Sequence, residues 1–401
     1  MMKIKEEKGS ISAIVMATIL FFITILSATY AINATMRKSQ RISEMQTKSQ
    51  YEAEFENIES IYNETLKKTG TLPTTAETMP YLPSRDYTQV NETNLSNGLV
   101  IQDKNGNQYV WVEVPKTSTV YPTAGLAITS FTDAEYTSIE NDLHTYTNTY
   151  RSQSISYTDT YYSDEQTGLT SDQYINLKKA MLKSVYKNGG FWVGRYEVGD
   201  ATSTASNVAR TSSTGYTDTA VIKADQHPYD YITCSQSESL ASKFAPNGRN
   251  SSLLFGVQWD LVLRYFESKG TTQADLKTNS TSWGNYYNAS FDITKGMYNA
   301  VDKLSWILAT WTSAGSNYTK AASSYILLTT GATDRNSKMN IYDMAGNVWE
   351  YTMEYDSDSS NPCTLRGGGF GNNILGIAAS EYASNNTTYI GSHCGLRVAL
   401  Y

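Results

Sequence analysis

The chain has 401 residues, a net charge of −7 and a low charged fraction of 18%, with 31 tyrosines. This length allows one large domain or two ordinary ones. No cluster of Lys and Arg offers a face for phosphates, so the sequence predicts no nucleic-acid partner.

The N-terminal segment predicts a membrane anchor. Residues 9–36 carry no charge, and residues 11–32 are strongly apolar, long enough for a helix to span a bilayer of about 30 Å. No clean small-x-small cleavage site follows, which favours a retained anchor. We expect residues 1–36 to form a cytoplasmic tip and a single transmembrane span, with the C-terminal domain outside the cell. Positive residues flank both ends almost equally, so charge alone does not set the orientation.

The stretch Lys8-Gly-Ser-Ile-Ser-Ala13 and the apolar run after it resemble the start of a type IV pilin or minor pseudopilin. In that family a prepilin peptidase cuts after the glycine, which here is Gly9. The fifth mature residue is usually Glu, whereas here it is Ile14. A simple signal anchor is the alternative.

Residues 37–70 predict an amphipathic stalk helix, because apolar residues recur there at steps of three and four. Residues 71–96 contain three prolines and many Thr, Ser and Asn, which indicates a linker. We expect the globular domain to occupy residues 97–401.

The domain is predicted to begin with a β-hairpin. Two β-rich runs, 99–103 and 108–114, flank an Asn-Gly turn. Residues 117–170 indicate a loop-rich insert with one helix or two. A helix over 171–186 and a strand over 191–198 follow, and a further helix is expected over 235–244.

Three C-terminal blocks carry the most information. They are Ile341-Tyr-Asp-Met-Ala-Gly-Asn-Val-Trp-Glu-Tyr351, Leu365-Arg-Gly-Gly-Gly-Phe370 and Cys394-Gly-Leu-Arg-Val398. In this order they resemble the formylglycine-generating-enzyme (sulfatase-modifying factor) family. The resemblance implies an α+β domain with a C-type-lectin-like fold and extends over about residues 97–401. It is weaker in the middle, where Gln258-Trp259-Asp260 stands in place of a run ending in Trp-Glu.

The resemblance also allows a test for catalysis. The oxidases of the family need two cysteines after the glycine block, as thiolate ligands for monovalent copper. Those positions here are Asn372 and Ile377. The three histidines are far apart in sequence, with no His-x-x-x-His that would suit the iron-binding branch. We therefore predict that the protein is not an enzyme, and a metal-dependent oxidase is the least favoured alternative.

Calcium is the cofactor that the resemblance implies, in a structural role. Carried over by position, the ligands are the side chains of Asp343 and Glu350 and the carbonyls of Gly346 and Val348. The alternative is that these acids only hydrogen-bond their loop. Arg366 and Arg397 are expected to tie the terminal strands together, and the glycines after Arg366 to let backbone segments approach closely.

Three cysteines are too few and too scattered for a disulfide framework or a zinc site. At most one disulfide forms, and Cys363–Cys394 is the pair to test.

Residues 371–393 are rich in Asn, Tyr and Ser, a composition that suits adaptable binding loops. This window resembles the variable region of proteins diversified by retroelements, although an ordinary polar loop is the alternative. The residues predicted to face a ligand are Asn372, Asn373, Tyr382, Asn385, Asn386, Tyr389 and His393.

These observations predict a membrane-anchored bacterial surface protein that binds a protein or glycan ligand on another cell or surface. The alternative is a minor type IV pilin or pilus-tip adhesin, with pilus subunits as partners. Ligand identity and oligomeric state do not follow from the sequence.

Overall fold

The computed structural model describes residues 72–401, apart from 152–156, 203–218, 302–309, 316–317 and 373–376. These residues belong to one unit, Leu72–Tyr401. Within this described part, no helix is both apolar enough and long enough to cross a membrane. The predicted anchor (1–36) and stalk (37–70) lie outside the described residues.

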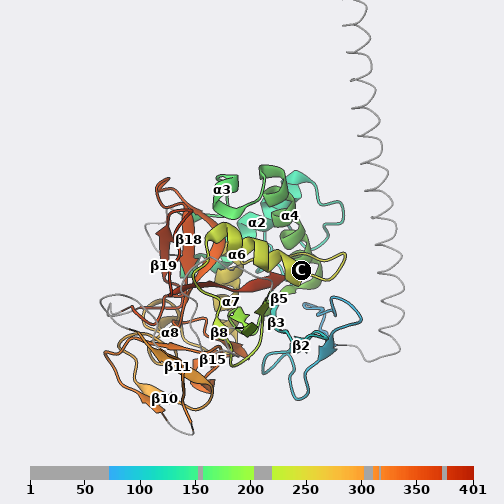
Figure 1. Ribbon diagram of the computed structural model, residues 1–401. Helices are drawn as coiled ribbons and strands as arrows, with labels where there is room; N and C mark the ends of the chain where they lie inside the picture. The colour runs from blue at the N-terminus through green and yellow to red at the C-terminus, as the bar shows by residue number, and fades with distance from the viewer. Residues whose placement is uncertain (1–71, 152–156, 203–218, 302–309, 316–317, 373–376) are drawn as a thin grey trace, which may run out of the picture. The chain divides into compact units, whose positions relative to one another are not determined.

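A six-stranded sheet forms the centre of the unit (Figure 1). Its strands are β1 Thr88–Gln89, β2 Val100–Gln102, β3 Gln108–Glu113, β5 Gly190–Gly194, β21 Val398–Leu400 and β9 Ser251–Leu253, in this spatial order. Every neighbouring pair is antiparallel. The C-terminal strand β21 therefore lies between two strands that are distant in sequence, which ties the end of the chain into the core.

The predicted hairpin and the predicted aromatic strand both belong to this sheet. Strands β2 and β3 are joined by a turn in which Asp103 accepts the backbone N–H groups of Asn105 and Asn107, each at 2.8 Å. Strand β5 ends at Gly194, earlier than the predicted 191–198, so Glu197 lies beyond the sheet.

A second sheet carries the C-terminal motifs. Its strands are β19 Tyr382–Asn385, β18 Cys363–Arg366, β17 Trp349–Asp356 and β20 Cys394–Leu396, in this order, with the short β4 Tyr157–Thr158 also paired to β17. Strands β17 and β20 are parallel, and the other pairs are antiparallel.

Helices cover one end of the unit, and short strands form the other (Figure 1). Threonines at the N-caps of three helices form capping boxes with a Glu or Gln three residues on, which satisfies the first free N–H groups. The helices are α2 Asp133–Thr147, α3 Asp164–Thr167, α4 Ser171–Asn188, α6 Cys234–Ala241, α7 Gly256–Ser268 and α8 Gln273–Lys277, with 3₁₀ turns η1 Asn148–Tyr150, η2 Ser242–Phe244 and η3 Asp334–Asn336.

The predicted helices are confirmed with small shifts at their ends. The insert 117–170 contains α2 and α3, the helix predicted over 171–186 is α4, and the helix predicted over 235–244 is α6 followed by η2. The remaining strands are β6 Gly199–Asp200, β7 Ala220–Val221, β8 His227–Pro228, β10 Phe291–Ile293, β11 Met297–Ala300, β12 Thr312–Ser313, β13 Tyr318–Lys320, β14 Ile326–Leu328, β15 Ser337–Lys338 and β16 Ile341–Tyr342.

The segment predicted as a linker, residues 71–96, instead packs on the main sheet from Leu72 onward. Thr78 is buried and accepts the indole N–H of Trp111 at 2.8 Å, and the carbonyl of Tyr81 accepts that of Trp192 at 2.9 Å. The prolines indicated irregular backbone correctly. An irregular segment can still be buried when its polar groups find partners, and here they do.

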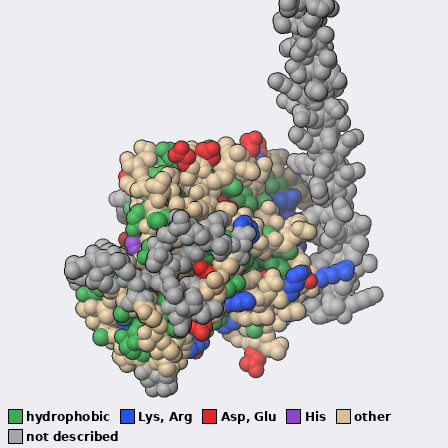
Figure 2. Space-filling model, in the orientation of Figure 1, with side chains coloured by type: hydrophobic (Ala, Val, Ile, Leu, Met, Phe, Trp, Pro, Cys, Tyr) green, Lys and Arg blue, Asp and Glu red, His purple; other side chains and the backbone are tan. Residues whose placement is uncertain are grey.

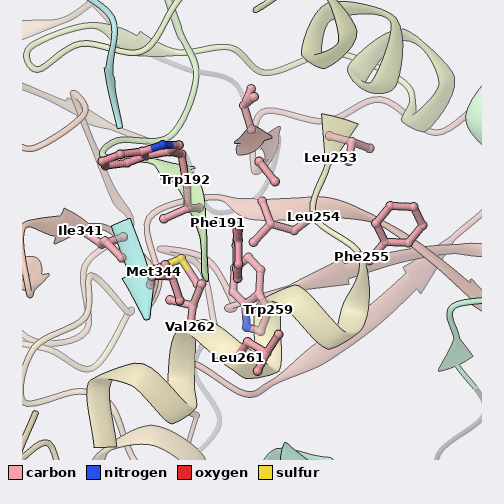
Figure 3. Packing of buried hydrophobic residues seen from close by; sticks show 14 of the residues in the cluster. Phe191, Trp192, Leu253, Leu254, Phe255, Trp259, Leu261, Val262, Ile341 and Met344 are labelled. Carbon is pink, nitrogen blue, oxygen red and sulfur yellow. The ribbon is translucent and has the colours of Figure 1, made fainter. Parts of the chain in front are cut away.

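The core lies between the main sheet and α7. Figure 3 shows Trp259 and Val262 of α7 beside Phe191 of β5, with Met344 close to Val262. All four residues are buried and belong to one hydrophobic cluster. Burial of such large apolar side chains is the main stabilising contribution to a fold of this size.

The surface drawn in Figure 2 is mostly polar and uncharged. Acidic side chains gather over α3, which carries the exposed Asp164 and Glu165, and basic side chains are scattered lower on the same face. Hydrophobic side chains form small separate patches there.

Candidate ligand-binding face

The second sheet brings the three C-terminal motifs into register. Glu350 of β17 lies opposite Arg366 of β18 on one side and Gly395 of β20 on the other. The glycines after Arg366 turn back into the core. Gly367 and Gly368 have φ angles of +87° and +76°, and a Cβ at Gly368 would lie 2.8 Å from the Tyr286 ring. Their predicted role in close packing is thus confirmed.

A deeply buried ion pair joins two of the motifs. Arg397 Nε donates to both oxygens of Glu350, at 3.1 and 2.9 Å, and Nη2 donates to Oε1 at 2.6 Å. The remaining guanidinium protons bind the carbonyls of Gly194 (2.9 Å) and Tyr342 (2.8 Å). Arg397 therefore joins β5, β16 and β17, which fits its predicted structural role.

Two further acids stand near this pair. Asp343 Oδ2 accepts the N–H of Gly331 at 2.9 Å, and Glu197 accepts the side-chain amide of Asn347 at 2.6 Å and the N–H of Val348 at 3.1 Å. Burial raises the pKa of Asp343 to about 6 and that of Glu197 well above its ordinary value, and the Asp343 charge adds to the rise at Glu197. The sequence signal for Glu197 was its place in the Tyr-Glu-Val segment, but it was not predicted as a site residue.

This arrangement bears on the predicted calcium ligands. Asp343, Gly346 and Val348 lie on the loop before β17 and Glu350 is the second residue of that strand, so hard oxygen donors that suit calcium lie on one short segment. Both oxygens of Glu350, however, are bound by Arg397. Among the described residues, no group of three His, Cys, Asp or Glu side chains is arranged to hold a metal ion. In this arrangement Arg397 occupies the Glu350 carboxylate, and calcium at these four positions stays a prediction.

A second buried ion network surrounds Arg366. Its guanidinium pairs with Asp260 of α7 at 2.5 Å. Arg151, from the insert, binds the other oxygen of Asp260 at 2.8 Å and Glu354 of β17 at 3.2 Å. Asp260 stands where the resembled family usually has Glu. Here it links Arg151 of the insert to Arg366 of the second sheet.

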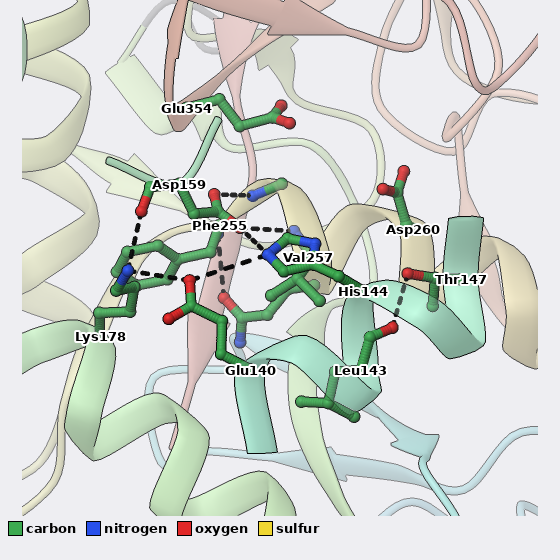
Figure 4. Close-up of polar contacts among 12 residues, drawn as sticks. Glu140, Leu143, His144, Thr147, Asp159, Lys178, Phe255, Val257, Asp260 and Glu354 are labelled. Carbon is green, nitrogen blue, oxygen red and sulfur yellow. Dashed lines mark hydrogen bonds and ion pairs between the residues drawn. The ribbon is translucent and has the colours of Figure 1, made fainter. Parts of the chain in front are cut away.

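The same junction extends to the N-terminus of α7 (Figure 4). Asp159 accepts the backbone N–H groups of Gly256 at 2.6 Å and Val257 at 2.9 Å, so its carboxylate caps the helix. His144 of α2 lies 3.7 Å from Glu140 and 3.9 Å from Asp159. The sequence did not predict this cluster, because its members are spread over the insert and the helices after it.

The predicted ligand residues fall into two groups. Tyr382 and Asn385 are half-buried at the two ends of β19, and three residues apart on a strand they point to opposite faces. Asn386 is exposed in the turn that follows, and its side chain accepts the N–H of Thr388 at 3.1 Å.

The second group lies around the last motif. Tyr389 and His393 contact each other, with 3.1 Å between the hydroxyl and Nε2. Burial lowers the pKa of His393, which favours a neutral ring at physiological pH. Asn372 accepts the N–H of Gly369 on its side chain at 2.6 Å, so it also shapes its own loop. Asn373 lies outside the described residues.

Four aromatic residues that the sequence did not single out adjoin this second group. The N–H of Tyr231 binds the carbonyl of Gly391 at 3.1 Å, and that of Trp349 binds the carbonyl of His393 at 2.8 Å. The N–H of Tyr287 binds the carbonyl of Asn372 at 3.2 Å, and the Tyr287 ring lies 4.5 Å from that of Tyr325. Tyr231 and Tyr325 also pack against the same small cluster of buried residues. We call the half-buried residues of this region the aromatic face: Tyr231, Tyr287, Tyr325, Trp349, Tyr389 and His393.

The predicted disulfide is excluded by strand pairing. Cys363 lies opposite Tyr355 on one side of β17, and Cys394 lies opposite Trp349 on the other. Six strand residues span about 20 Å, far more than a disulfide can bridge. All three cysteines are free and buried. The neighbour of Cys363 is the Cys234 thiol, whose pKa is raised by a hydrogen bond to Cys363 and by burial.

Comparison with known families identifies the C-terminal part of the chain. A model of the sulfatase-modifying factor enzyme 1-like domain matches residues 183–401, more than half of the sequence. The matched region contains all three motifs. A comparison with curated proteins found no match.

A comparison with solved structures found several matches, two of which follow. One is titled "Crystal Structure of CarF", with 12% identity over 73% of this chain and 85% of that chain and a TM-score of 0.25. The other is Treponema denticola variable protein 1, with 12% identity over 81% of this chain and 99% of that chain and a TM-score of 0.22. These superpositions are too loose to transfer a function.

Proposed function

The chain belongs to the family defined by the sulfatase-modifying factor enzyme 1-like domain, and we propose that it is a ligand-binding rather than a catalytic member. The binding surface is the aromatic face together with the half-exposed residues of 371–393. One observation supports this most strongly. Six half-buried aromatic and imidazole side chains lie around the C-terminal motifs, and backbone hydrogen bonds hold four of them there.

The residues at the copper positions support the absence of oxidase chemistry. Asn372 carries an amide oxygen that binds its own loop, and Ile377 is an apolar side chain that is 2% exposed. Neither supplies the thiolate that monovalent copper requires. The three cysteines of the chain are buried elsewhere in the core.

The chemistry of the face suggests an uncharged epitope as ligand. None of the six side chains is an acid, a lysine or an arginine. Tyr and Trp supply rigid contact area at a low entropic cost and are enriched in binding hot spots, while Asn and Ser beside them supply adaptable hydrogen bonds. A protein or glycan surface on another cell suits these groups.

The setting we propose is the cell surface. The apolar segment within residues 1–36 would anchor the chain in the membrane with a single pass, residues 37–70 would form a stalk, and the domain would be extracellular. The second candidate is a minor type IV pilin or pilus-tip adhesin, favoured by the glycine at position 9. Mass spectrometry of the mature N-terminus distinguishes them, because a pilin would begin at Ser10.

Calcium at the 343–350 loop stays a prediction, and it requires Arg397 to release Glu350. If calcium binds, saturating calcium should raise the melting temperature of the protein above its value in EDTA. The Asp343→Ala variant, which has no side-chain oxygen, should remove that rise. Equal melting temperatures in calcium and EDTA would contradict the prediction that calcium binds.

The test of the proposed function is sequencing of the last part of the gene across one population. Substitutions concentrated at Asn and Tyr codons of 371–393, with Gly367–Phe370 and Leu396–Val398 unchanged, would support a diversified binding surface. Uniform sequence there would remove the diversification and leave a fixed adhesin or pilus component.

A second experiment tests the absence of catalysis. The copper-treated protein is incubated with cysteine-containing peptides and oxygen, and the peptides are examined by mass spectrometry. We expect no conversion of cysteine to formylglycine, and conversion would overturn the proposal.

A further inference from the structure

Lys320, the last residue of β13, is 0% exposed. Its ammonium donates to the carbonyls of Tyr286 at 2.7 Å and Ala289 at 2.8 Å, with that of Tyr287 at 3.5 Å. The charge therefore lies in a cage made by backbone oxygens of a single loop, residues 286–289.

The charges around Lys320 do not neutralise it. Arg335 of η3 repels it and lies 4.4 Å from the ring of Phe291, the strand partner of Lys320. Asp292 of β10 is exposed and bonds to Thr319. Burial and the Arg335 charge lower the pKa of Lys320 to about 7. The carbonyls of the cage therefore offset only part of the free-energy cost of burying the ammonium.

The caged loop is also the one that supports the aromatic face. The N–H of Tyr287 binds the carbonyl of Asn372, and its own carbonyl accepts the N–H of Ser323 at 2.8 Å. The hydroxyl of Tyr286 binds the carbonyl of Gly367 at 2.8 Å. The loop therefore joins Lys320 to the start of the predicted ligand window.

We propose that Lys320 is a positioning residue that acts as a built-in cation. Its ammonium fills a carbonyl site that would otherwise need a bound ion, and so fixes the loop that presents Tyr287 and supports Asn372. Without a donor, the carbonyl of Ala289 would lose its bond to the ammonium, those of Tyr286 and Tyr287 would keep only the N–H groups of Ala289 and Ser323, and the loop would be held less firmly. That this loop matters for ligand binding rests on the proposed function, but the hold of Lys320 on the loop does not.

The test uses hydrogen exchange of the unliganded protein. In Lys320→Met, which keeps the apolar stem without the donors, the amides of Tyr287 and Ser323 should exchange at least about tenfold faster, the equivalent of losing one hydrogen bond to a charged group. The free energy of global unfolding should fall little or rise, because a costly buried charge has been removed. A residue that only filled space would show the opposite pattern. Amides of Tyr287 and Ser323 that stay as protected as in wild type would overturn the proposal.

Chemical rescue tests the charge directly. Lys320→Ala empties the cage, and ethylammonium chloride should restore protection of the two amides, whereas sodium chloride at the same ionic strength should not. The control is Lys295→Ala, which removes a lysine 2.6 Å from Asp334 on the surface of the same region. Protection that ethylammonium does not restore would overturn the cation role. Because no ligand is used, failure of the binding proposal would leave both results interpretable.

Discussion

The interior and the outer face of the second sheet are held together in different ways. Inside, charged side chains bind each other directly: Glu350 and Arg397 are almost completely buried, and Arg397 donates to both oxygens of Glu350. On the aromatic face several contacts run through the backbone, as between Trp349 and His393 or Tyr231 and Gly391, beside the side-chain contact of Tyr389 with His393. A backbone contact survives a change of side chain, whereas an ion pair does not. The fold thus combines a fixed interior with a surface whose side chains are free to differ.

The largest expected effect comes from breaking the interior pair. Arg397→Met leaves the Glu350 carboxylate buried without its partner, which should lower the free energy of unfolding by about 3–5 kcal/mol. Urea denaturation measures this. Asp86→Asn is the control, because it removes an exposed ion pair with Lys104 and should change stability by less than about 1 kcal/mol. A loss at Arg397 no larger than the control would contradict the difference between interior and face.

The next prediction tests whether residues 72–96 are part of the packed interior of the domain. Thr78→Val removes the acceptor of the Trp111 indole N–H and the donor to the Gly189 carbonyl, both buried. The Gly189 carbonyl keeps the N–H of Val114, so stability should fall by about 1–3 kcal/mol, the cost of leaving the buried indole N–H unpaired. Thr74→Val, at an exposed position of the same segment, is the matched control. If both variants were equally stable, residues 72–96 would be the linker that composition predicted.

A smaller effect concerns the junction between the insert and α7. Burial opposes the charged ring of His144, but its hydrogen bond to Glu140 and the charge of Asp159 raise its pKa overall, against Arg151. A raised pKa in the folded state means that the stabilisation is complete below the unfolded pKa of about 6.5 and is lost as pH rises through the folded value.

Wild type should therefore lose up to about 1 kcal/mol relative to His144→Gln between pH 6 and pH 8, as expected for a partly exposed ion pair. Unfolding measured in urea at both pH values checks this. Parallel pH profiles of the two proteins would show that the histidine charge does not fasten the insert.

The sequence predicted best what depends on local pattern or on contiguous motifs. The Asn-Gly hairpin and the capped helices follow from neighbouring residues, and the three C-terminal blocks identified the family. Prediction from the sequence failed where the residue that decides the outcome is far away in the chain. Nothing near Cys363 shows that β17 separates it from Cys394, or that Thr78 meets Trp111 across 33 positions.

The candidate site also has a part that the sequence predicted and a part that it did not. Composition indicated the window 371–393, but the aromatic face also draws Tyr231, Tyr287 and Tyr325 from earlier segments, and only the fold brings them there. Lys320 lies still further from prediction, because its partners are backbone carbonyls that carry no sequence signal.

The smallest expected effect belongs to the residues of 371–393 that lie in the proposed binding surface beside the aromatic face. Asn386→Ser keeps a hydroxyl in place of the amide oxygen in an exposed turn, and Tyr382→Ser removes a half-buried ring from the edge strand β19. We expect Asn386→Ser to change the free energy of unfolding by less than about 0.5 kcal/mol and Tyr382→Ser by about 1 kcal/mol. Urea denaturation of both variants beside Arg397→Met would rank the two regions on one scale. Losses at these positions as large as that at Arg397 would mean that these side chains themselves hold the 371–393 segment in place. A surface of that kind has no freedom to vary its ligand, and the binding proposal would then be restricted to a single fixed specificity.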